Sequence, residues 1–238
     1  MPNDATSAVL TQFILIRHGA TDTIGQCISG RRSGNPLNAE GKLQAEEVAA
    51  ELRRFQISAV YASPMERTRE TARIIATALQ LSAVTSDSLA EIEYGDWTGR
   101  PFSELANIAE WRLFNRFRSH ARVPGGEMMV EVQSRVVAEM LRLEQKHRGA
   151  SVALVSHADV IRSAVGYYAG IPIDLLHRIV INLASVSIVA IGERDAQVLC
   201  VNALTPFFPK RPDQWTAPGS KPERSPVSAE KTWRNTIG

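Results

Sequence analysis

One apolar run near the start of the chain ends in an arginine and a histidine, and it constrains the fold more than any other stretch. Residues Phe13–Ile16 are apolar and partly β-branched, which is typical of a buried strand. Arg17, His18 and Gly19 follow, and the glycine lets the backbone turn sharply. In an open α/β sheet, ligands bind at the carboxyl ends of the strands. His18 is therefore a candidate nucleophile for a phosphoryl group, and Arg17 a candidate ligand of the phosphate oxygens.

The segments that follow alternate between short strands and longer helices. We expect helices where apolar residues recur at helical spacing or capping signals occur, over residues 39–55, 64–79, 127–147 and 160–169. We expect strands at the short apolar runs, residues 59–62, 83–85, 151–156, 186–191 and 198–201. Ser63 is predicted to cap the second helix, with Pro64 at its first position and Glu66 at its third. The alternation predicts an α/β fold, a three-layer sandwich with a mostly parallel central sheet flanked by helices.

Two stretches differ from this pattern. Residues 101–126 are rich in aromatic side chains and arginines, and we expect a helical lid insertion within a catalytic domain of residues 1–204. From residue 205 onward Pro, Lys, Arg and Ser dominate, which predicts an extended or disordered tail. Residues 205–238 hold six basic and three acidic side chains against a net charge of +2 for the chain. The remainder is close to neutral, which argues against a nucleic-acid partner.

Cysteine content and apolar patterning favour a cytoplasmic protein. Cys27 and Cys200 give no disulfide framework, so reduced thiols are the simpler interpretation. The first residues lack the basic-then-apolar order of a signal peptide. The longest apolar stretch, residues 179–191, is interrupted by polar residues and is too short to cross a membrane. We therefore expect no membrane partner, and the sequence gives no indication of the oligomeric state.

Two more polar residues are expected at the same edge of the sheet as His18, and a carboxyl group in a loop is a further candidate. Arg67 lies in the first turns of the helix that follows the second predicted strand. His157 ends the fourth predicted strand, and Glu91 lies in a loop. The start of a helix also offers free N–H groups to an anion. The sequence thus gathers two histidines and two arginines where ligands bind.

The four motifs together resemble the histidine phosphatase superfamily, also called phosphoglycerate-mutase-like, over about residues 11–204. The motifs are Arg17-His18-Gly19 and the segments Ser63–Thr68, Glu91–Gly99 and Val155–Ala158. The resemblance implies that His18 is the nucleophile and Glu91 the proton donor. It also implies a phosphate pocket made of Arg17, Arg67, His157 and Thr21.

One position departs from the family pattern. Many members carry an asparagine three residues after the threonine of the signature, where it helps to hold phosphate. Here that position is Ile24. Gln26 and Arg31 are candidates to take over its role, which makes Arg31 a further candidate substrate-binding residue.

The residue types fit phosphoryl transfer. Arginine offers a planar fork that matches phosphate oxygens and stays charged. Nearby cations keep His18 neutral, and neutral imidazole can attack phosphorus to form a phosphohistidine. Glu91 would protonate the leaving oxygen and then take a proton from water, with Glu93 as the alternative acid. No cluster in the sequence has metal-ligand spacing, so we expect neither a metal nor a cofactor.

The lid has two interpretations. Arg112 and Arg116 alternate with Trp111, Phe114 and Phe117. The pattern fits an amphipathic helix whose aromatics pack inward while its arginines face water. It also fits a lid whose arginines recognise a second anionic or aromatic part of the substrate. Arg162, in the last predicted helix, is expected to face solvent.

The sequence predicts a metal-independent phosphomonoesterase of the histidine acid phosphatase type that acts on a small phosphorylated metabolite. One alternative is a phosphoglycerate mutase that depends on 2,3-bisphosphoglycerate. The segment Gly95–Gly99 and the short interval from Glu91 to His157 resemble the phosphatase branch instead. Another alternative is a phospho-ligand-binding or scaffold protein with weak catalysis. The sequence does not identify the substrate.

Overall fold

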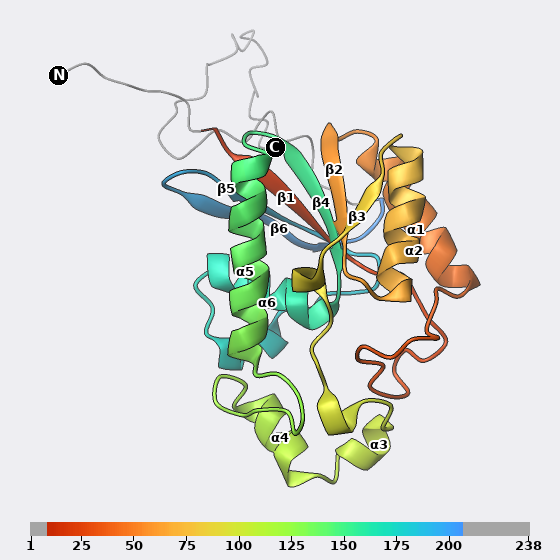
Figure 1. The fold of residues 1–238 in the computed structure, drawn as a ribbon, viewed down its shortest axis with the longest axis vertical. Helices are drawn as coiled ribbons and strands as arrows, with labels where there is room; N and C mark the ends of the chain where they lie inside the picture. Colours follow the sequence, from red (N-terminus) through yellow and green to blue (C-terminus); the bar gives the residue numbers. More distant parts are fainter. Residues whose placement is uncertain (1–8, 207–238) are drawn as a thin grey trace, which may run out of the picture.

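A six-stranded sheet forms the centre of the molecule (Figure 1). The structure is a computed structural model and describes residues 9–206. The strands are β1 (Thr11–Arg17), β2 (Ile57–Ala62), β3 (Ala83–Thr85), β4 (Ser151–Ser156), β5 (Val186–Ile191) and β6 (Ala196–Ala203). Their order across the sheet is β3-β2-β4-β1-β5-β6. Neighbours from β3 to β1 pair in parallel, whereas β5 is antiparallel to both β1 and β6. The predicted mostly parallel sheet is confirmed.

Helices cover both faces of the sheet and complete three layers (Figure 1). They are α1 (Ala39–Leu52) and α2 (Glu66–Ala78) on one face and α5 (Met129–Lys146) and α6 (Ala158–Tyr168) on the other. Because side chains alternate along a strand, β1 contributes to both cores. Phe13 and Leu15 pack with α5 and α6, while Ile14 and Ile16 pack with α1 and α2. This burial on both faces explains the unbroken apolar run.

Two helices begin later than the sequence predicts. Helix α2 starts at Glu66 with Met65 as its N-cap, so the predicted cap at Ser63 is wrong. The Ser63 hydroxyl instead lies 2.7 Å from His157 Nε2, a contact between segments far apart in the chain. Helix α5 starts at Met129, and the carboxylate of Glu127 binds Arg31 from the loop after β1 as well as Arg135 of α5 itself. In both cases a side chain that the local pattern places at the start of a helix instead contacts a residue from a distant part of the chain.

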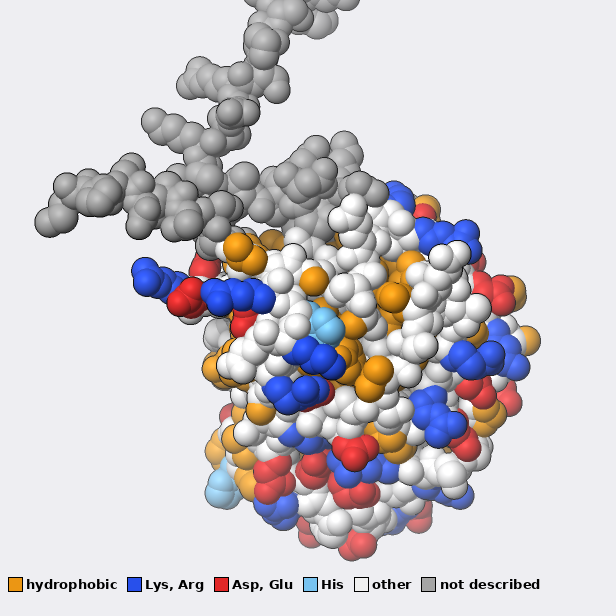
Figure 2. All heavy atoms as spheres, turned by 45° about the horizontal axis from the view of Figure 1, so that its top comes forward, with side chains coloured by type: hydrophobic (Ala, Val, Ile, Leu, Met, Phe, Trp, Pro, Cys, Tyr) orange, Lys and Arg blue, Asp and Glu red, His pale blue; other side chains and the backbone are white. Residues whose placement is uncertain are grey.

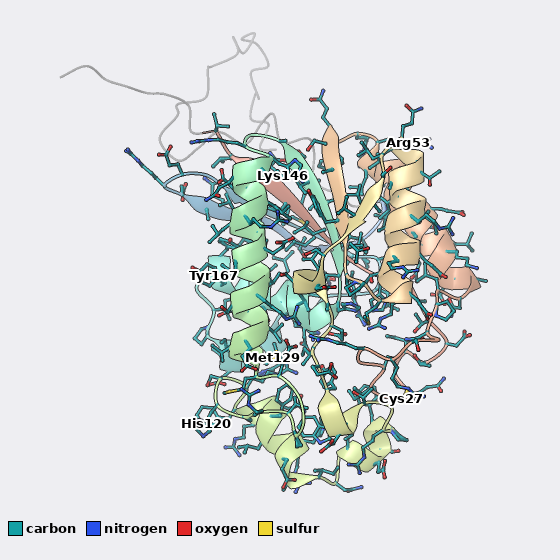
Figure 3. All side chains as sticks on the ribbon, in the orientation of Figure 1. Cys27, Arg53, His120, Met129, Lys146 and Tyr167 are labelled. Atoms are coloured by element: carbon teal, nitrogen blue, oxygen red, sulfur yellow. The ribbon has the colours of Figure 1, made fainter. Side chains whose placement is uncertain are left out.

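The insertion of residues 101–126 holds two short helices, α3 (Phe102–Leu105) and α4 (Ala109–Arg116). They lie together beyond the C-terminal ends of the parallel strands, at the Met129 end of α5 (Figures 1 and 3). Trp97 anchors them, with its ring centroid 5.3 Å from that of Trp111 and 5.6 Å from that of Phe114. Aromatic packing thus seats the predicted lid against the domain. Short 3-10 turns occupy Asp87–Leu89, Gly95–Trp97 and Ile173–Arg178.

Charged side chains of both signs are interspersed over the face shown in Figure 2. This distribution agrees with the near-neutral charge expected for the domain. No helix in residues 9–206 is long and apolar enough to cross a membrane. The predicted tail from residue 207 onward lies outside the described residues.

Candidate active site

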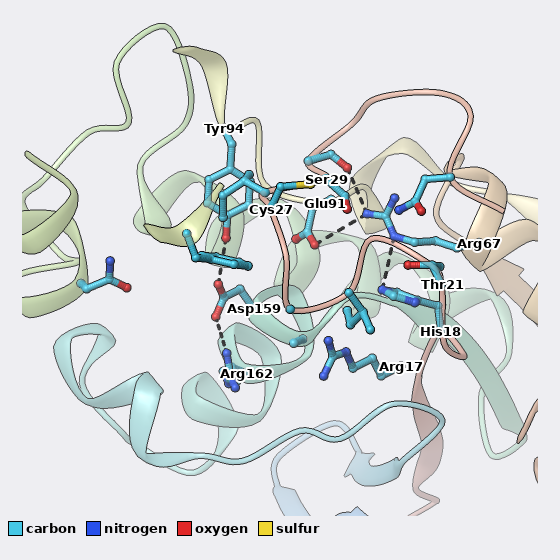
Figure 4. Close-up of a pocket in the computed structure, with 18 of the residues that line it drawn as sticks. Arg17, His18, Thr21, Cys27, Ser29, Arg67, Glu91, Tyr94, Asp159 and Arg162 are labelled. Atoms are coloured by element: carbon cyan, nitrogen blue, oxygen red, sulfur yellow. Dashed lines mark hydrogen bonds and ion pairs between the residues drawn. The ribbon is translucent and has the colours of Figure 1, made fainter. Parts of the chain in front are cut away.

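A cavity of about 280 Å³ lies at the C-terminal ends of β1 and β4 (Figure 4). Its wall includes side chains from the end of β1, the following loop, the first turn of α2 and the loop before Gly95, namely Arg17, His18, Thr21, Asn35, Arg67, Glu91 and Tyr94. The lid and the start of α6 complete it with Phe102, Trp111, Asn115, Arg118, Asp159 and Arg162. The edge of the sheet at which we expected a ligand therefore carries a cavity.

His18 enters this cavity as a neutral imidazole. Burial, together with the charges of Arg67 and Arg17, holds its pKa well below the usual range. Its Nδ1 lies 2.8 Å from the Gly19 carbonyl oxygen, which can only accept, so the proton sits on Nδ1. Its Nε2 accepts from Arg67 Nε at 3.3 Å. Nε2 therefore carries no proton, and its electron pair is the one that can attack a ligand.

The turn after His18 requires glycine. A Cβ on Gly19 would lie 2.4 Å from the carbonyl oxygen of Gly41 in α1. Helix α1 therefore approaches the backbone next to the histidine more closely than any side chain would allow. This contact fixes the position of the imidazole relative to the sheet.

Arg17 and Arg67 each have one buried N–H donor without a hydrogen-bond partner in residues 9–206. Arg67 is 2% exposed, and its Nη2 donates to Gly30 O at 3.0 Å and lies 3.1 Å from His157 Nδ1. Arg17 Nη1 donates to Ile181 O at 2.7 Å. Within residues 9–206, the buried Arg67 Nη1 and Arg17 Nε have no hydrogen-bond partner. Leaving such a donor unpaired costs about 1–3 kcal/mol, so the arrangement fits a site that an anion completes.

His157 lies behind Arg67 and does not line the cavity. Its ring is fully buried, and its centroid is 5.3 Å from that of His18. Nε2 contacts the Ser63 hydroxyl and Nδ1 contacts Arg67, so both ring nitrogens are used. Burial and the charge of Arg67 hold the pKa of His157 well below its usual range. The geometry places His157 as a neutral support for Arg67.

Glu91 lines the cavity beside Arg67 (Figure 4). Its Oε2 lies 3.8 Å from Arg67 Nη2 and 3.5 Å from His157 Nδ1, while Oε1 accepts from the Ile92 N–H at 3.0 Å. Burial raises the pKa of Glu91, and the opposing charge of Arg67 does not cancel that effect. Glu93, the alternative acid, is 38% exposed and pairs with Arg31 at 3.5 Å. Of the two, Glu91 lines the cavity.

The loop after Thr21 contains a residue that the sequence analysis missed. Thr21 lines the cavity as expected, and Ile24 lies at its rim, 41% exposed. Asn35 lines the cavity too, and its Oδ1 accepts from Thr23 Oγ1 at 2.9 Å. Its buried Nδ2 has no partner in the part of the chain that the structure describes. No motif around Asn35 signals this, because its orientation depends on a contact twelve residues away.

The two candidates for the missing asparagine lie elsewhere. Gln26 is exposed and donates to Asp22 O at 3.0 Å. Arg31 lies outside the cavity wall, where its Nε donates to the backbone carbonyl of Glu91 at 2.8 Å. In this structure Asn35 offers a donor to the cavity, whereas Gln26 and Arg31 do not.

The far wall of the cavity is a buried ion cluster. Asp159 Oδ1 accepts from Arg118 Nη1 and Arg162 Nη1, both at 2.9 Å, and Oδ2 accepts from the Tyr94 hydroxyl at 3.1 Å. Burial alone would raise the pKa of Asp159, but the two guanidinium groups hold it far below its usual range. Arg162 is 22% exposed and lines the cavity, so the prediction that it faces solvent is wrong. Its Nε donates to Ile179 O, which turns it inward.

Arg112 and Arg116, the two lid arginines predicted to recognise substrate, do not line the cavity. Arg112 and Arg116 are exposed, and they border a hollow on the outer side of the lid. Arg112 Nη1 donates to Ala106 O at 3.1 Å. The lid reaches the cavity through Phe102, Trp111, Asn115 and Arg118 instead. Within the described range 9–206, no three His, Cys, Asp or Glu side chains are grouped to hold a metal ion.

Comparison with known proteins defines the class. Residues 13–204 match the histidine phosphatase superfamily (branch 1), and the chain belongs to this family of phosphatases and mutases. A bifunctional protein of Mycobacterium tuberculosis is 37% identical over 183 residues, 75% of this chain and 50% of that protein. The chain thus spans about half the length of the first curated relatives it matches.

Two further proteins are similar to this chain. The phosphoglycerate mutase-like protein 4 of Arabidopsis thaliana is 32% identical over 165 residues, 67% of this chain and 72% of that protein. The crystal structure of the alpha-ribazole phosphatase from Shigella flexneri superposes with a TM-score of 0.72 at 26% identity. It covers 81% of this chain and 96% of the other.

Proposed function

We propose that this protein is a metal-independent phosphomonoesterase that acts on a small phosphorylated metabolite through a phosphohistidine on His18. One observation carries the proposal: the unprotonated Nε2 of a neutral His18 lies in one cavity with Arg17 and Arg67, each of which has a buried N–H donor without a partner in residues 9–206. Glu91, opposite, has a raised pKa that suits a proton donor. The likeness to the alpha-ribazole phosphatase structure supports the hydrolytic reaction.

In the first step the phosphate dianion lies against Arg17 and Arg67, with Asn35 Nδ2 as a further donor. Nε2 of His18 attacks phosphorus, and the bond from phosphorus to the ester oxygen breaks in line with it. The leaving oxygen takes the proton of the Glu91 carboxyl group, so the product departs as an alcohol. The imidazole carries the phosphoryl group, with its Nδ1 proton still bound to Gly19 O.

In the second step water replaces the alcohol. Glu91, now a carboxylate, takes a proton from the water as its oxygen attacks phosphorus. The bond between phosphorus and Nε2 breaks, and inorganic phosphate leaves. His18 returns to its neutral form and Glu91 to its protonated form, so the cycle closes without a metal.

The size of the cavity favours a small substrate. Ligand pockets for drug-sized molecules span about 300–1,000 Å³, and this cavity of about 280 Å³ lies just below that range. A phosphate group and a compact alcohol fit such a volume, whereas a folded phosphoprotein would reach it only through a narrow side chain. Trp111 and Tyr94 give the alcohol part an aromatic wall, and Arg162 gives it a charged one.

The alternative reaction is phosphoglycerate mutation, which would use the same phosphohistidine. The likeness to the Arabidopsis protein supports this candidate. A mutase returns the phosphoryl group to a second hydroxyl group while water is excluded, whereas a phosphatase admits water. The two reactions therefore differ in what leaves the site after the first step.

A panel of phosphomonoesters tests the proposal. We expect phosphate release without 2,3-bisphosphoglycerate and in the presence of a metal chelator, and loss of that release in a folded His18→Ala variant. Interconversion of 3- and 2-phosphoglycerate that depends strictly on the bisphosphate, with little phosphate release, would support the mutase. Tight binding of phosphorylated ligands without turnover would support the binding-protein alternative.

A further inference from the structure

The backbone carbonyl of Glu91 is held from outside the cavity by two arginines. Arg31 Nε donates to it at 2.8 Å and Arg135 Nη2 at 3.2 Å. Arg31 comes from the loop after β1, and Arg135 from α5. Two elements that are far apart in the chain therefore meet on one atom of the proposed proton donor. Neither arginine lines the cavity.

Glu127 binds both arginines and the donor loop at once. Its Oε2 accepts from Arg31 Nη2 at 2.9 Å, from Arg135 Nη2 at 3.2 Å and from the Glu93 N–H at 2.9 Å. Its Oε1 accepts from Arg135 Nε at 3.1 Å. The Glu127 N–H in turn donates to Glu93 O at 3.0 Å. The Glu127 carboxylate thus connects the loop that carries Arg31 and the helix that carries Arg135 to the stretch that carries Glu91.

The backbone is shaped for this contact. A Cβ on Gly126 would lie 2.1 Å from Glu93 O, so only glycine lets the end of the lid insertion approach the donor loop this closely. The three charged side chains are between 18% and 31% exposed, so they are shielded but not deeply buried. A hydrogen-bonded group of this kind holds its geometry more firmly than an exposed ion pair.

Arg31 and Arg135 donate hydrogen bonds to the backbone of Glu91 and do not pair with its carboxylate. An ion pair would lower the pKa of the Glu91 carboxyl group and keep it deprotonated. Both guanidinium groups bind its carbonyl oxygen instead, while Glu127 takes up their charge. Burial alone would raise the pKa of Glu127, but the hydrogen bonds and charges around it hold that pKa below the usual value. The group therefore stays ionised, and it adds no ion pair that would lower the pKa of the Glu91 carboxyl group.

We propose that Glu127, Arg31 and Arg135 form a positioning group that sets the place of the Glu91 carboxyl group for proton transfer. Proton transfer requires the donor within about 2.6–3.2 Å of the leaving oxygen, so a small shift of the loop weakens it. The inference rests on the proposed function, because it assigns Glu91 the role of proton donor. The three residues touch neither substrate nor phosphate, so they act through Glu91.

The test compares two substrates in the full chain. Glu127→Gln keeps the size of the side chain but removes its charge and one acceptor. Because general acid catalysis is worth about 10²–10⁴-fold, a misplaced donor should lower kcat on an alkyl phosphate by about tenfold or more. The loss on 4-nitrophenyl phosphate, whose leaving group needs little protonation, should stay within about twofold. KM should change little, since the phosphate-binding residues are untouched.

Matched variants separate positioning from general damage. Glu131→Gln removes an exposed carboxylate four residues further along and should leave both substrates unaffected. Arg31→Lys keeps the charge but loses the fork, and it should reproduce the selective loss if Glu127→Gln does not fold. In a Glu91→Gln background, Glu127→Gln should cause no further loss of kcat on the alkyl phosphate, because its effect passes through Glu91.

Failure of the inference differs from failure of the proposed function. Equal losses on both substrates in a folded Glu127→Gln variant would overturn the positioning role. So would losses that add fully to those of Glu91→Gln, or no loss at all. If Glu91→Gln itself leaves the alkyl phosphate unaffected, the assignment of the proton donor falls, and the positioning role falls with it.

Discussion

The protonation of His18 and of Glu91 determines which chemistry the candidate site can carry out. The carbonyl of Gly19 fixes a proton on His18 Nδ1, which leaves Nε2 as the attacking atom. Burial keeps a proton on Glu91 at pH values where an exposed glutamate is ionised. The pKa of His18 is lowered and that of Glu91 is raised, which favours a neutral base and a protonated acid in one site, the pairing that phosphoryl transfer to nitrogen requires.

The pH dependence of kcat follows from these directions. Glu91 is active in its protonated form, so kcat should fall as pH rises through its raised pKa, and a bound phosphate dianion raises that pKa further. Glu91→Gln should remove this alkaline decline and slow alkyl phosphates by about 10²-fold. Activated aryl phosphates should be affected far less. An unchanged pH profile in the variant would show that another group supplies the proton.

Substitutions of Asn35 test whether its side chain binds phosphate, because aspartate has the same size as asparagine but carries a negative charge. If its Nδ2 donates to the phosphate, Asn35→Ala should raise KM by about tenfold, in line with about 1.5–3 kcal/mol for a hydrogen bond to a charged group. Asn35→Asp should raise KM more, because a carboxylate repels the dianion. Steady-state kinetics on one substrate suffices. A KM for Asn35→Asp equal to that of the wild type would show that the side chain orients its neighbours instead.

Sequence motifs brought together the residues that follow strand ends. His18 ends β1, and Arg67 begins the helix after β2, so a shared sheet edge was enough to place them together. Asn35 and Arg162 escaped prediction because their orientation depends on Thr23 and on Ile179 O, contacts that local pattern does not encode. The roles assigned to all these residues remain predictions.

Among the elements, the lid shows why charge content alone does not identify a ligand site. Helix α4 is amphipathic, and the side that meets the cavity carries Trp111 and Asn115 rather than Arg112 and Arg116. Which side faces inward follows from the contact of Trp97 with Trp111 and Phe114. That contact is between segments that the sequence pattern treats separately.

The effect of a substitution on KM should therefore depend on whether the residue faces the cavity or the outer side of the lid. We expect the double variant Arg112→Ala/Arg116→Ala to keep KM within about twofold of the wild type, as is usual for exposed positions. Arg162→Ala, inside the cavity, should raise KM for substrates with a polar alcohol part. Kinetics across several phosphomonoesters would compare them. A large rise of KM in the double variant would mean that the lid turns its outer side inward when substrate binds.

At the scale of the whole molecule, the alternation of strands and helices predicted the layers and the mostly parallel sheet. It did not predict that β5 would reverse direction beside β1, since strand direction depends on the length and path of the connection from α6. The apolar pattern also placed both cores, because β1 is buried on both faces. Helix ends were predicted less well where side chains serve tertiary contacts, as at Ser63.

The buried acids should affect the stability of the fold in opposite directions. Asp159 has a folded pKa below its unfolded value, so its contribution is present above the unfolded pKa and is lost as pH falls. Asp159→Asn should destabilise the protein by about 3 kcal/mol, because it leaves Arg118 and Arg162 without a counter-charge. Glu91 has a raised folded pKa, so its ionisation opposes folding at high pH.

Thermal unfolding measures both effects. We expect Glu91→Gln to have a Tm equal to or above that of the wild type at pH 8, and Asp159→Asn to have a lower Tm at neutral pH. The difference between Asp159→Asn and the wild type should shrink below pH 4. A lower Tm for Glu91→Gln would mean that the carboxylate of Glu91 in the wild type stabilises the fold through its contact with Arg67.

The central claim is that His18 carries the phosphoryl group, and rapid quenching during turnover tests it most directly. Protein quenched within milliseconds of mixing with a phosphate-labelled monoester should carry an acid-labile, base-stable label. Mass spectrometry of the peptide that contains His18 should locate it there, and the His18→Ala variant should carry none. A label on a serine, or full turnover by a folded His18→Ala variant, would contradict the claim.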